Sequence, residues 1–274
     1  MSLRINQNIS AMNTHRQLLH TDRKLAASLE KLSSGLRINR AADDSAGLAI
    51  SQRLRSQVGG LKMASNNADQ AKNMVQTAEG FLNEVHNMLG RMRELSVQAA
   101  SDTVDSANRT SLHGEFNELR EEIDRIATMA EYNNQALLDG TFINKQFQIG
   151  PNGDPDNTIT FDIAGVSSAR LSIDTTDISA LAGATTAMSE LTSAIDYVST
   201  VRSGLGTIQN RLAYTVASVD NAAENLAASE SAIRDLDISD EISTFTKSQI
   251  LVQAGMAMLA QANAAPQNVL ALFR

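Results

Sequence analysis

The histidines and the adjacent acids are the side chains of this chain that could support metal or acid–base chemistry. Four histidines are scattered along the sequence, with no HExxH or other ligand spacing: His15, His20, His86 and His113. Two pairs of adjacent acids could exchange protons with a substrate: Asp43 with Asp44, and Glu121 with Glu122. On helices, such pairs are more often solvated charges or N-caps. We therefore expect no metal site and no catalytic carboxylates.

The sequence also gives no support for nucleotide binding or thiol chemistry. Gly204 and Gly206 lack the rest of a GxGxxG motif after a strand. The chain has 0 Cys, which excludes a disulfide framework, a thiolate metal site and a cysteine nucleophile. We predict a protein that is not an enzyme and uses no cofactor.

Near both ends, apolar residues repeat in alternating steps of three and four, which is the spacing of a coiled-coil seam. The N-terminal ridge is Ile5, Ile9, Met12 and Leu19, continued by Leu25, Leu29, Leu32 and Leu36. The C-terminal ridge is Ile238, Ile242, Phe245, Gln249, Val252, Met256 and Leu259. More apolar residues lie off this seam: Ile250, Leu251, Met258, Leu270 and Phe273. Such ridges usually mark an interaction surface, so we expect neighbouring copies to cover them.

Between the ridges the helical spacing is long. A helix is expected to restart near Ser45, and a long helix is expected from about residue 58 to 100. A second helix returns along it after a polar turn at 101–108. Short alternating runs at 158–163 and 170–173, among Gly and Pro residues, predict hairpin strands. Helical spacing then resumes at Met188.

The predicted fold is therefore mainly α. It is an elongated antiparallel bundle of long helices with terminal coiled-coil arms and a small β-hairpin region at about 140–177. Aromatic residues make up only 4% of the chain and Pro is limited to 3, which suits thin helical cores.

Charge and hydropathy narrow the possible partners. The net charge is -8 and no cluster of Lys and Arg is present, which argues against nucleic acid. The sequence contains no run of about 20 apolar residues, which is the length needed to span a membrane. The N-terminus lacks the apolar stretch of a Sec-type signal peptide, so secretion would need a route without a cleaved signal.

Several motifs resemble those of bacterial flagellin. LEKLSSGLRINRAADDSAGLAIS at 29–51 is similar to the N-terminal signature of that family, and the run 229–274, with SESAIRDLD and PQNVLALFR, is similar to its C-terminal end. GRMRELSVQAA at 90–100, EIDRIA at 122–127 and EYNNQALLDG at 131–140 match as well. The middle is short, so the chain resembles a flagellin reduced to its two core domains.

The resemblance implies a hollow helical filament of identical subunits that serves swimming motility. Residues 1–44 plus 235–274 would form the inner coiled-coil domain, and residues 45–234 the outer domain. It also implies uncleaved export through the flagellar type III apparatus to the extracellular filament. Further implied partners are an export chaperone on the C-terminal arm, a filament cap and hook-filament junction proteins.

Flagellins are also ligands of the innate immune receptor Toll-like receptor 5. On the matching motif, Arg91, Leu95 and Glu115 would contact the receptor. Nearby residues are Arg93, Glu94 and Gln98. Because residues 91, 94, 95 and 98 share a helix face, they could instead serve subunit packing alone.

A polar connector between the inner and outer domains is implied at Arg37, Asn39, Arg40, Asp43 and Asp44. It could carry ion pairs between subunits that respond to changes of filament form, or it could be a capped turn. Two rival functions stay open: a hook-filament junction protein, and a secreted membrane-active helical protein.

Overall fold

The computed structural model describes residues 7–271, with side chains up to residue 264. The chain divides into two compact units, residues 1–56 with 225–274 and residues 57–224. We call the first the terminal unit and the second the central unit. Residues 45–56 and 225–234, which we expected in the outer domain, are grouped here with the terminal unit.

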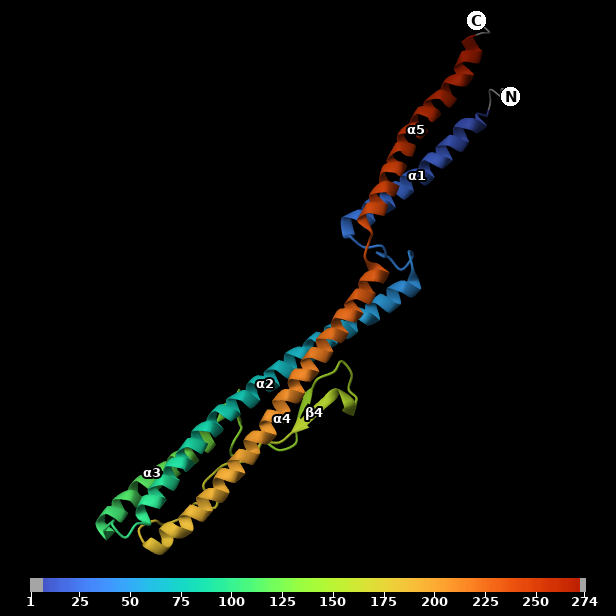
Figure 1. Cartoon of the computed structure of the whole chain (residues 1–274). Helices are drawn as coiled ribbons and strands as arrows, with labels where there is room; N and C mark the ends of the chain where they lie inside the picture. Colours follow the sequence, from blue (N-terminus) through green and yellow to red (C-terminus); the bar gives the residue numbers. More distant parts are fainter. Residues whose placement is uncertain (1–6, 272–274) are drawn as a thin grey trace. The chain divides into compact units, whose positions relative to one another are not determined.

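Long helices dominate both units, as predicted (Figure 1). The helices are α1 (Ile9–Ser34), α2 (Ser45–Ala99), α3 (Ser106–Met129), α4 (Leu181–Arg234) and α5 (Ile238–Ala271). The strands are β1 (Glu131–Tyr132), β2 (Gln135–Ala136), β3 (Lys145–Gln148) and β4 (Thr158–Phe161), with a 3-10 turn η1 at Pro155–Asn157. The mainly α fold class is confirmed.

In the terminal unit, α1 and α5 lie side by side and antiparallel (Figure 1). The Asn8 side chain caps α1 by accepting from the Ala11 backbone N–H at 3.0 Å, and its Nδ2 donates to the Ala262 carbonyl at 2.7 Å. α1 ends at Gly35, whose φ of 71° is left-handed and therefore suits a residue without Cβ. The two arms pair as predicted, but many large residues of the two ridges remain exposed instead of meeting in the seam.

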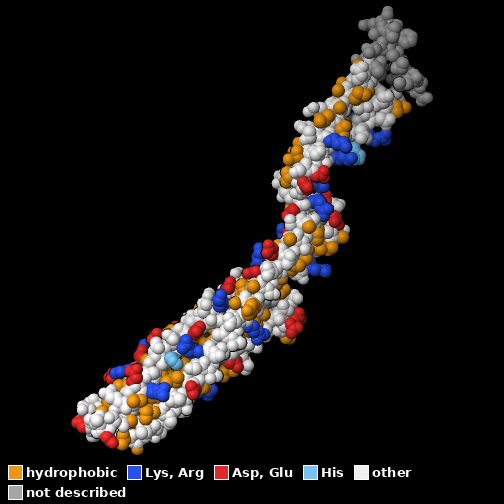
Figure 2. All heavy atoms as spheres, viewed as in Figure 1, with side chains coloured by type: hydrophobic (Ala, Val, Ile, Leu, Met, Phe, Trp, Pro, Cys, Tyr) orange, Lys and Arg blue, Asp and Glu red, His pale blue; other side chains and the backbone are white. Residues whose placement is uncertain are grey.

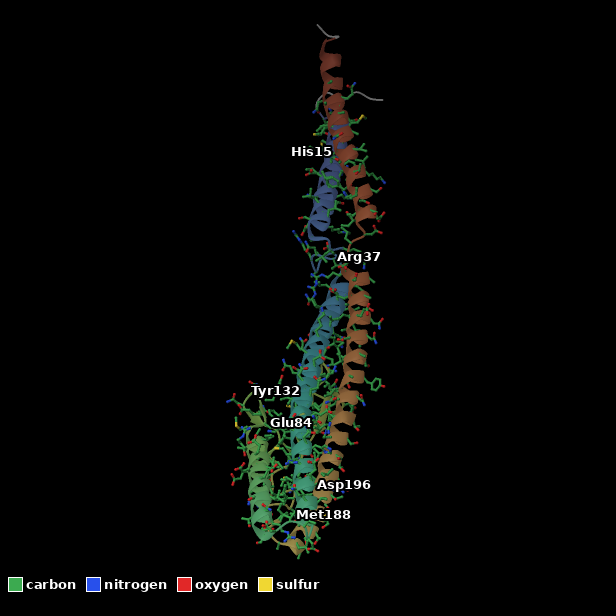
Figure 3. The ribbon with its side chains drawn as sticks, turned by 60° about the vertical axis from the view of Figure 1, so that its left-hand side comes forward. His15, Arg37, Glu84, Tyr132, Met188 and Asp196 are labelled. Carbon is green, nitrogen blue, oxygen red and sulfur yellow. The ribbon has the colours of Figure 1, made fainter. Side chains whose placement is uncertain are left out.

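In the central unit, α2 lies between α3 and α4 (Figure 3). One line of α2 residues repeats every three or four positions and is fully buried, as at Val75, Leu82 and Leu89. A second line, with Met74 and Leu95, is buried too. α2 therefore packs on two sides, and the three helices share one core.

The two hairpins only partly match the prediction. β3 and β4 form an antiparallel pair that agrees with the predicted strand at 158–163. β1 and β2 form a second antiparallel pair before the predicted region begins, with Asn133 and Asn134 at positive φ in its turn. A two-residue turn at positive φ is a common hairpin connection for Asn, so the Asn-Asn pair is the signal that could have predicted it.

The predicted strand at 170–173 is wrong. Leu171 and Ile173 are buried, as alternation requires, but their backbone N–H groups donate to the carbonyls of Ser167 and Ser168 in consecutive turns. A tertiary contact explains the difference. The Asp124 carboxylate of α3 accepts from the Ser168 backbone N–H at 2.7 Å and from its hydroxyl at 2.6 Å, which holds this segment as a turn.

Candidate assembly surfaces

Small residues line the seam between α1 and α5. Thr21 and Ser28 of α1 are buried there, together with Ser248 of α5. At Gly255 a Cβ would lie 3.0 Å from Leu18 Cδ1, so glycine lets the two helices approach closely. The Thr21 hydroxyl donates to the Gln17 carbonyl at 3.0 Å, which allows this polar group to be buried.

Many large apolar residues of the predicted ridges flank this seam and remain between 46% and 69% exposed. These are Ile9, Met12, Leu19, Leu29, Ile238, Ile242 and Met256. Others are half-buried along the seam: Leu25, Leu32, Phe245, Val252 and Leu259. Ile5 and Phe273 lie outside the described residues, and so does the side chain of Leu270. The helix pair thus keeps an exposed apolar band, part of which is visible in Figure 2.

A groove of about 530 Å³ follows one side of the pair. Thr14, Leu18 and Thr21 of α1 line it, with Leu251 and Met258 of α5. Leu251 and Met258 are also among the exposed large apolar residues. An apolar side chain from another helix could therefore be buried along this groove.

The predicted connector residues form a capped turn. Asp43 Oδ2 accepts from the backbone N–H groups of Arg40 at 2.8 Å and Asn39 at 3.1 Å. Asp44 Oδ1 accepts from the Gly47 N–H at 2.9 Å and caps α2. The structure thus brings Asn39, Arg40, Asp43 and Asp44 together. Both carboxylates already accept hydrogen bonds from backbone N–H groups of the same unit.

The connector is also tied to the helices of the terminal unit. Arg37 donates from Nε and Nη2 to the Ile233 carbonyl at 3.1 and 2.5 Å. Asn39 and Arg40 both donate to Glu30 Oε1 at 2.8 Å. Arg37 therefore binds the end of α4, whereas Asn39 and Arg40 bind α1.

The Asp43 carboxyl is expected to titrate below the ordinary aspartate range. The N–H groups of Arg40 and Asn39 stabilise the carboxylate and hold the pKa of Asp43 below its usual value. Because the folded pKa is the lower one, the carboxylate stabilises the turn above the unfolded pKa of about 3.9, and this is lost as the pH falls through the folded pKa. An NMR titration of the Asp43 carboxyl carbon would measure this. A midpoint at or above the ordinary value would contradict it, and Asp43→Asn should remove the pH dependence of the Arg40 amide signal.

A mostly buried charge cluster beside the connector was missed by sequence reasoning. Glu230 lies 3.5 Å from Arg55 and 4.0 Å from Arg234. The Glu230 and Arg234 side chains are each only 15% exposed. The four-residue spacing of Glu230 and Arg234 was the available signal, but an exposed pair of that kind is common and the contact from α2 could not be foreseen.

The predicted receptor residues lie on the central unit. Arg91 donates to Glu115 Oε1 at 2.9 Å and to Glu94 Oε2 at 3.1 Å, which joins α2 to α3. Two hydrogen bonds raise the pKa of Arg91 above its usual value. The one to Glu94 has the larger effect, and the one to Glu115 comes second. The side chains of Arg93 and Gln98 are exposed nearby. This constellation could bind a polar partner surface.

Leu95 does not belong to this surface. Its side chain is 0% exposed in the core between the helices, so it cannot contact a partner in this conformation. A shallow groove of about 550 Å³ lies next to the charged residues, lined by Arg93, Gln98, Val97 and Ile195. Val97, which is 54% exposed, is the apolar residue of this face that the helical spacing did not single out.

The histidines and adjacent acids that were considered for metal or acid–base chemistry make other contacts in the structure. Among the described residues, no three His, Asp or Glu side chains are grouped closely enough to hold a metal ion. His113 stacks on Phe116 and lies 2.9 Å from Asn117. Glu122 pairs with Arg125 at 2.5 Å, which lowers the pKa of this carboxyl. None of the helices in the described part of the chain is long and apolar enough to cross a membrane.

Known proteins resemble the chain over nearly its full length. Residues 5–143 match the bacterial flagellin N-terminal helical region, and residues 188–273 match the bacterial flagellin C-terminal helical region. A flagellin of Halalkalibacterium halodurans is 45% identical over 98% of this chain and 99% of its own length. A flagellin of Bacillus subtilis is 42% identical over 99% of this chain and 100% of its own.

A solved structure agrees with these sequence matches. The crystal structure of Bacillus cereus flagellin, 28% identical, superposes with a TM-score of 0.51 and covers 60% of this chain and 94% of its own. The two matched helical regions span most of the sequence and lie on the helices described above. The chain therefore belongs to the bacterial flagellin family.

Proposed function

We propose that copies of this chain build a hollow filament in which the terminal helix pairs form an inner tube and the long central helices an outer tube. Flagellins are structural subunits of the flagellar filament and not enzymes, so self-assembly is the family's activity. In this proposal residues 1–44 with 235–274 form the inner domain and residues 45–234 the outer domain. The exposed apolar band on α1 and α5 supports the inner role most directly.

The energetics favour assembly through this band. Full burial of an Ile or Met side chain contributes about 1.5–3 kcal/mol, so covering side chains that are half exposed contributes about 1 kcal/mol each. In the described part of each copy, seven ridge residues are exposed in this way. Several such contacts can offset the entropy of fixing a subunit at a filament end, which is estimated at 4–15 kcal/mol.

Seeded growth tests the proposal. Purified subunit mixed with short fragments of its own filament should elongate them, as seen by electron microscopy and light scattering. A chain truncated before Ile238 should not elongate them, because it lacks α5 and therefore half of the inner pair. If the full chain stays monomeric and truncation changes nothing, the filament proposal fails. Growth on its own fragments also separates a filament subunit from a hook-filament junction protein.

The same surface suits the other proposed partners. An export chaperone that holds the C-terminal arm would cover the exposed residues of α5, such as Ile250 and Leu251, before assembly. Cap and hook-filament junction proteins would meet the arms at the filament ends. A membrane-active role is less well supported, because α5 has acidic Asp240 and Glu241 in its first turn and few basic residues. Export without a cleaved signal, to the extracellular filament, completes the proposal.

We further propose that the central unit is a ligand of Toll-like receptor 5. The observation that favours this is the exposed set Arg91, Arg93, Glu94, Gln98 and Glu115 beside the Val97 groove. Arg91 is held in place by two carboxylates, which reduces the entropy lost on binding. Leu95 would act only by fixing α2 in the core.

Arg91→Ala is expected to weaken receptor signalling about tenfold or more, because a charge-assisted hydrogen bond is worth roughly 1.5–3 kcal/mol. The measurement is a dose–response curve in receptor-expressing cells, with circular dichroism to confirm folding. Arg125→Ala is the matched control, since Arg125 is similarly exposed and also pairs with a glutamate on its own helix. Unchanged potency of the Arg91 variant would remove the receptor proposal.

A further inference from the structure

Methionines of this chain differ widely in exposure. Met74 and Met92 are 3% and 0% exposed in the central unit. Met12, Met256 and Met258 of the terminal unit are 69%, 54% and 62% exposed. Exposure governs which thioethers an oxidant can reach. The terminal helix pair is therefore open to oxidation where the central core is protected.

The three exposed methionines cover different sides of the α1–α5 pair. Met258 lines the groove together with Leu18 and Leu251. Met256 points to another side of α5, because residues two apart on a helix differ by about 200° in direction. Met12 belongs to the exposed ridge of α1. Oxidation would thus introduce polar groups around much of the apolar band.

We propose that Met12, Met256 and Met258 are oxidation sites through which a peroxide switches the free subunit from assembly-competent to assembly-incompetent. This inference rests on the proposed packing of the terminal units. A sulfur lone pair attacks one oxygen of hydrogen peroxide and the O–O bond breaks. The thioether becomes a sulfoxide, oxidised by two electrons, and the peroxide is reduced to water.

The consequence follows from the surroundings of each sulfur. A sulfoxide oxygen is a strong hydrogen-bond acceptor, so covering it with the apolar surface of a neighbouring copy costs free energy wherever no donor meets it. Met12 and Met256 lie on the apolar band and incur this cost most directly, whereas the groove beside Met258 also contains Arg16 and Gln17. Free subunit exposes the three sulfurs to water, so oxidation there meets no such penalty. In the filament the same sulfurs are covered by neighbouring copies and are shielded. Methionine sulfoxide reductases reverse the modification, so the change is a switch and not only damage.

The test treats free subunit with hydrogen peroxide, removes the oxidant, and measures elongation of untreated filament fragments by light scattering. Peptide mass spectrometry locates the sulfoxides. We expect oxidation at residues 12, 256 and 258 and at the equally exposed Met63 and Met129, with a fall in the elongation rate of about tenfold or more that comes from the first three. The variant Met12→Leu/Met256→Leu/Met258→Leu is compared with its own untreated sample, and peroxide should leave its elongation rate unchanged because it carries no thioether at these positions.

The matched control is Met63→Leu/Met129→Leu, which replaces two methionines of the central unit that are each 60% exposed. It should lose elongation on oxidation like the wild type, and a methionine sulfoxide reductase should restore it. Normal elongation by wild type oxidised at residues 12, 256 and 258 would overturn the inference. So would failure of the reductase to restore the control, or an equal loss in the triple variant. Untreated wild type that does not elongate would instead refute the proposed assembly.

Discussion

Seeded elongation is expected to be abolished by Ile242→Asp combined with Ile250→Lys, while the subunit stays folded. Both side chains are at least half exposed on α5, at 50% and 59%, so neither charge disturbs the seam with α1. Once a neighbouring copy covers them, each buried charge incurs an effective penalty of several kcal/mol. A penalty of about 3 kcal/mol raises the critical concentration roughly a hundredfold.

The control places the same charges on polar positions of the same helix, Ser243→Asp with Gln253→Lys. Both residues are exposed. Each double variant adds one Asp and one Lys, so neither changes the net charge. Critical concentrations from pelleting, with circular dichroism of the free subunits, give the comparison. If the isoleucine variant elongates as readily as the wild type, the apolar band is not the assembly surface. If both variants fail equally, charge rather than apolar contact controls assembly.

Phe116→Ala is expected to destabilise the central unit by about 3–5 kcal/mol, the usual loss for a buried Phe. Phe116 is 0% exposed on α3 and packs within the shared helix core, so its removal leaves a cavity that the long helices cannot easily close. For a unit of this size the midpoint of thermal unfolding should fall by roughly 6–20 °C.

Urea unfolding followed by tyrosine fluorescence measures this directly. All 3 Tyr residues, Tyr132, Tyr197 and Tyr214, belong to the central unit, so the signal reports that unit. Met129→Ala is the control on the same helix, because Met129 is 60% exposed. A Phe116→Ala loss no larger than that of the control would show that α3 contributes little to the core.

Local signals predicted the helices well. The start of α2 at Ser45 agrees with the capping residues before it, and α3 covers the predicted returning helix. Helix period and cap chemistry act over a few residues, so they can be read without knowing the neighbours. The prediction was less accurate between α3 and α4. Asn133 and Asn134 form the turn of an unpredicted hairpin. Asp124 holds a predicted strand as a turn.

The sequence could not predict which side chains of the candidate surfaces are exposed. Arg91 and Glu115 come together from α2 and α3, whereas Leu95, one turn from Arg91, is buried. Helical spacing shows that residues three or four apart lie on the same face of a helix. It cannot say which half of that face a second helix covers.

The sequence by itself determined that both ends are helices with more apolar surface than one partner can cover, because residue type and period are local properties. Only the tertiary structure decided which apolar residues stay exposed. α1 and α5 meet along Thr21, Ser28, Ser248 and Gly255, since small side chains allow the closest approach, and the larger residues are left on the flanks. Close packing depends on both surfaces at once, so neither ridge alone could show it.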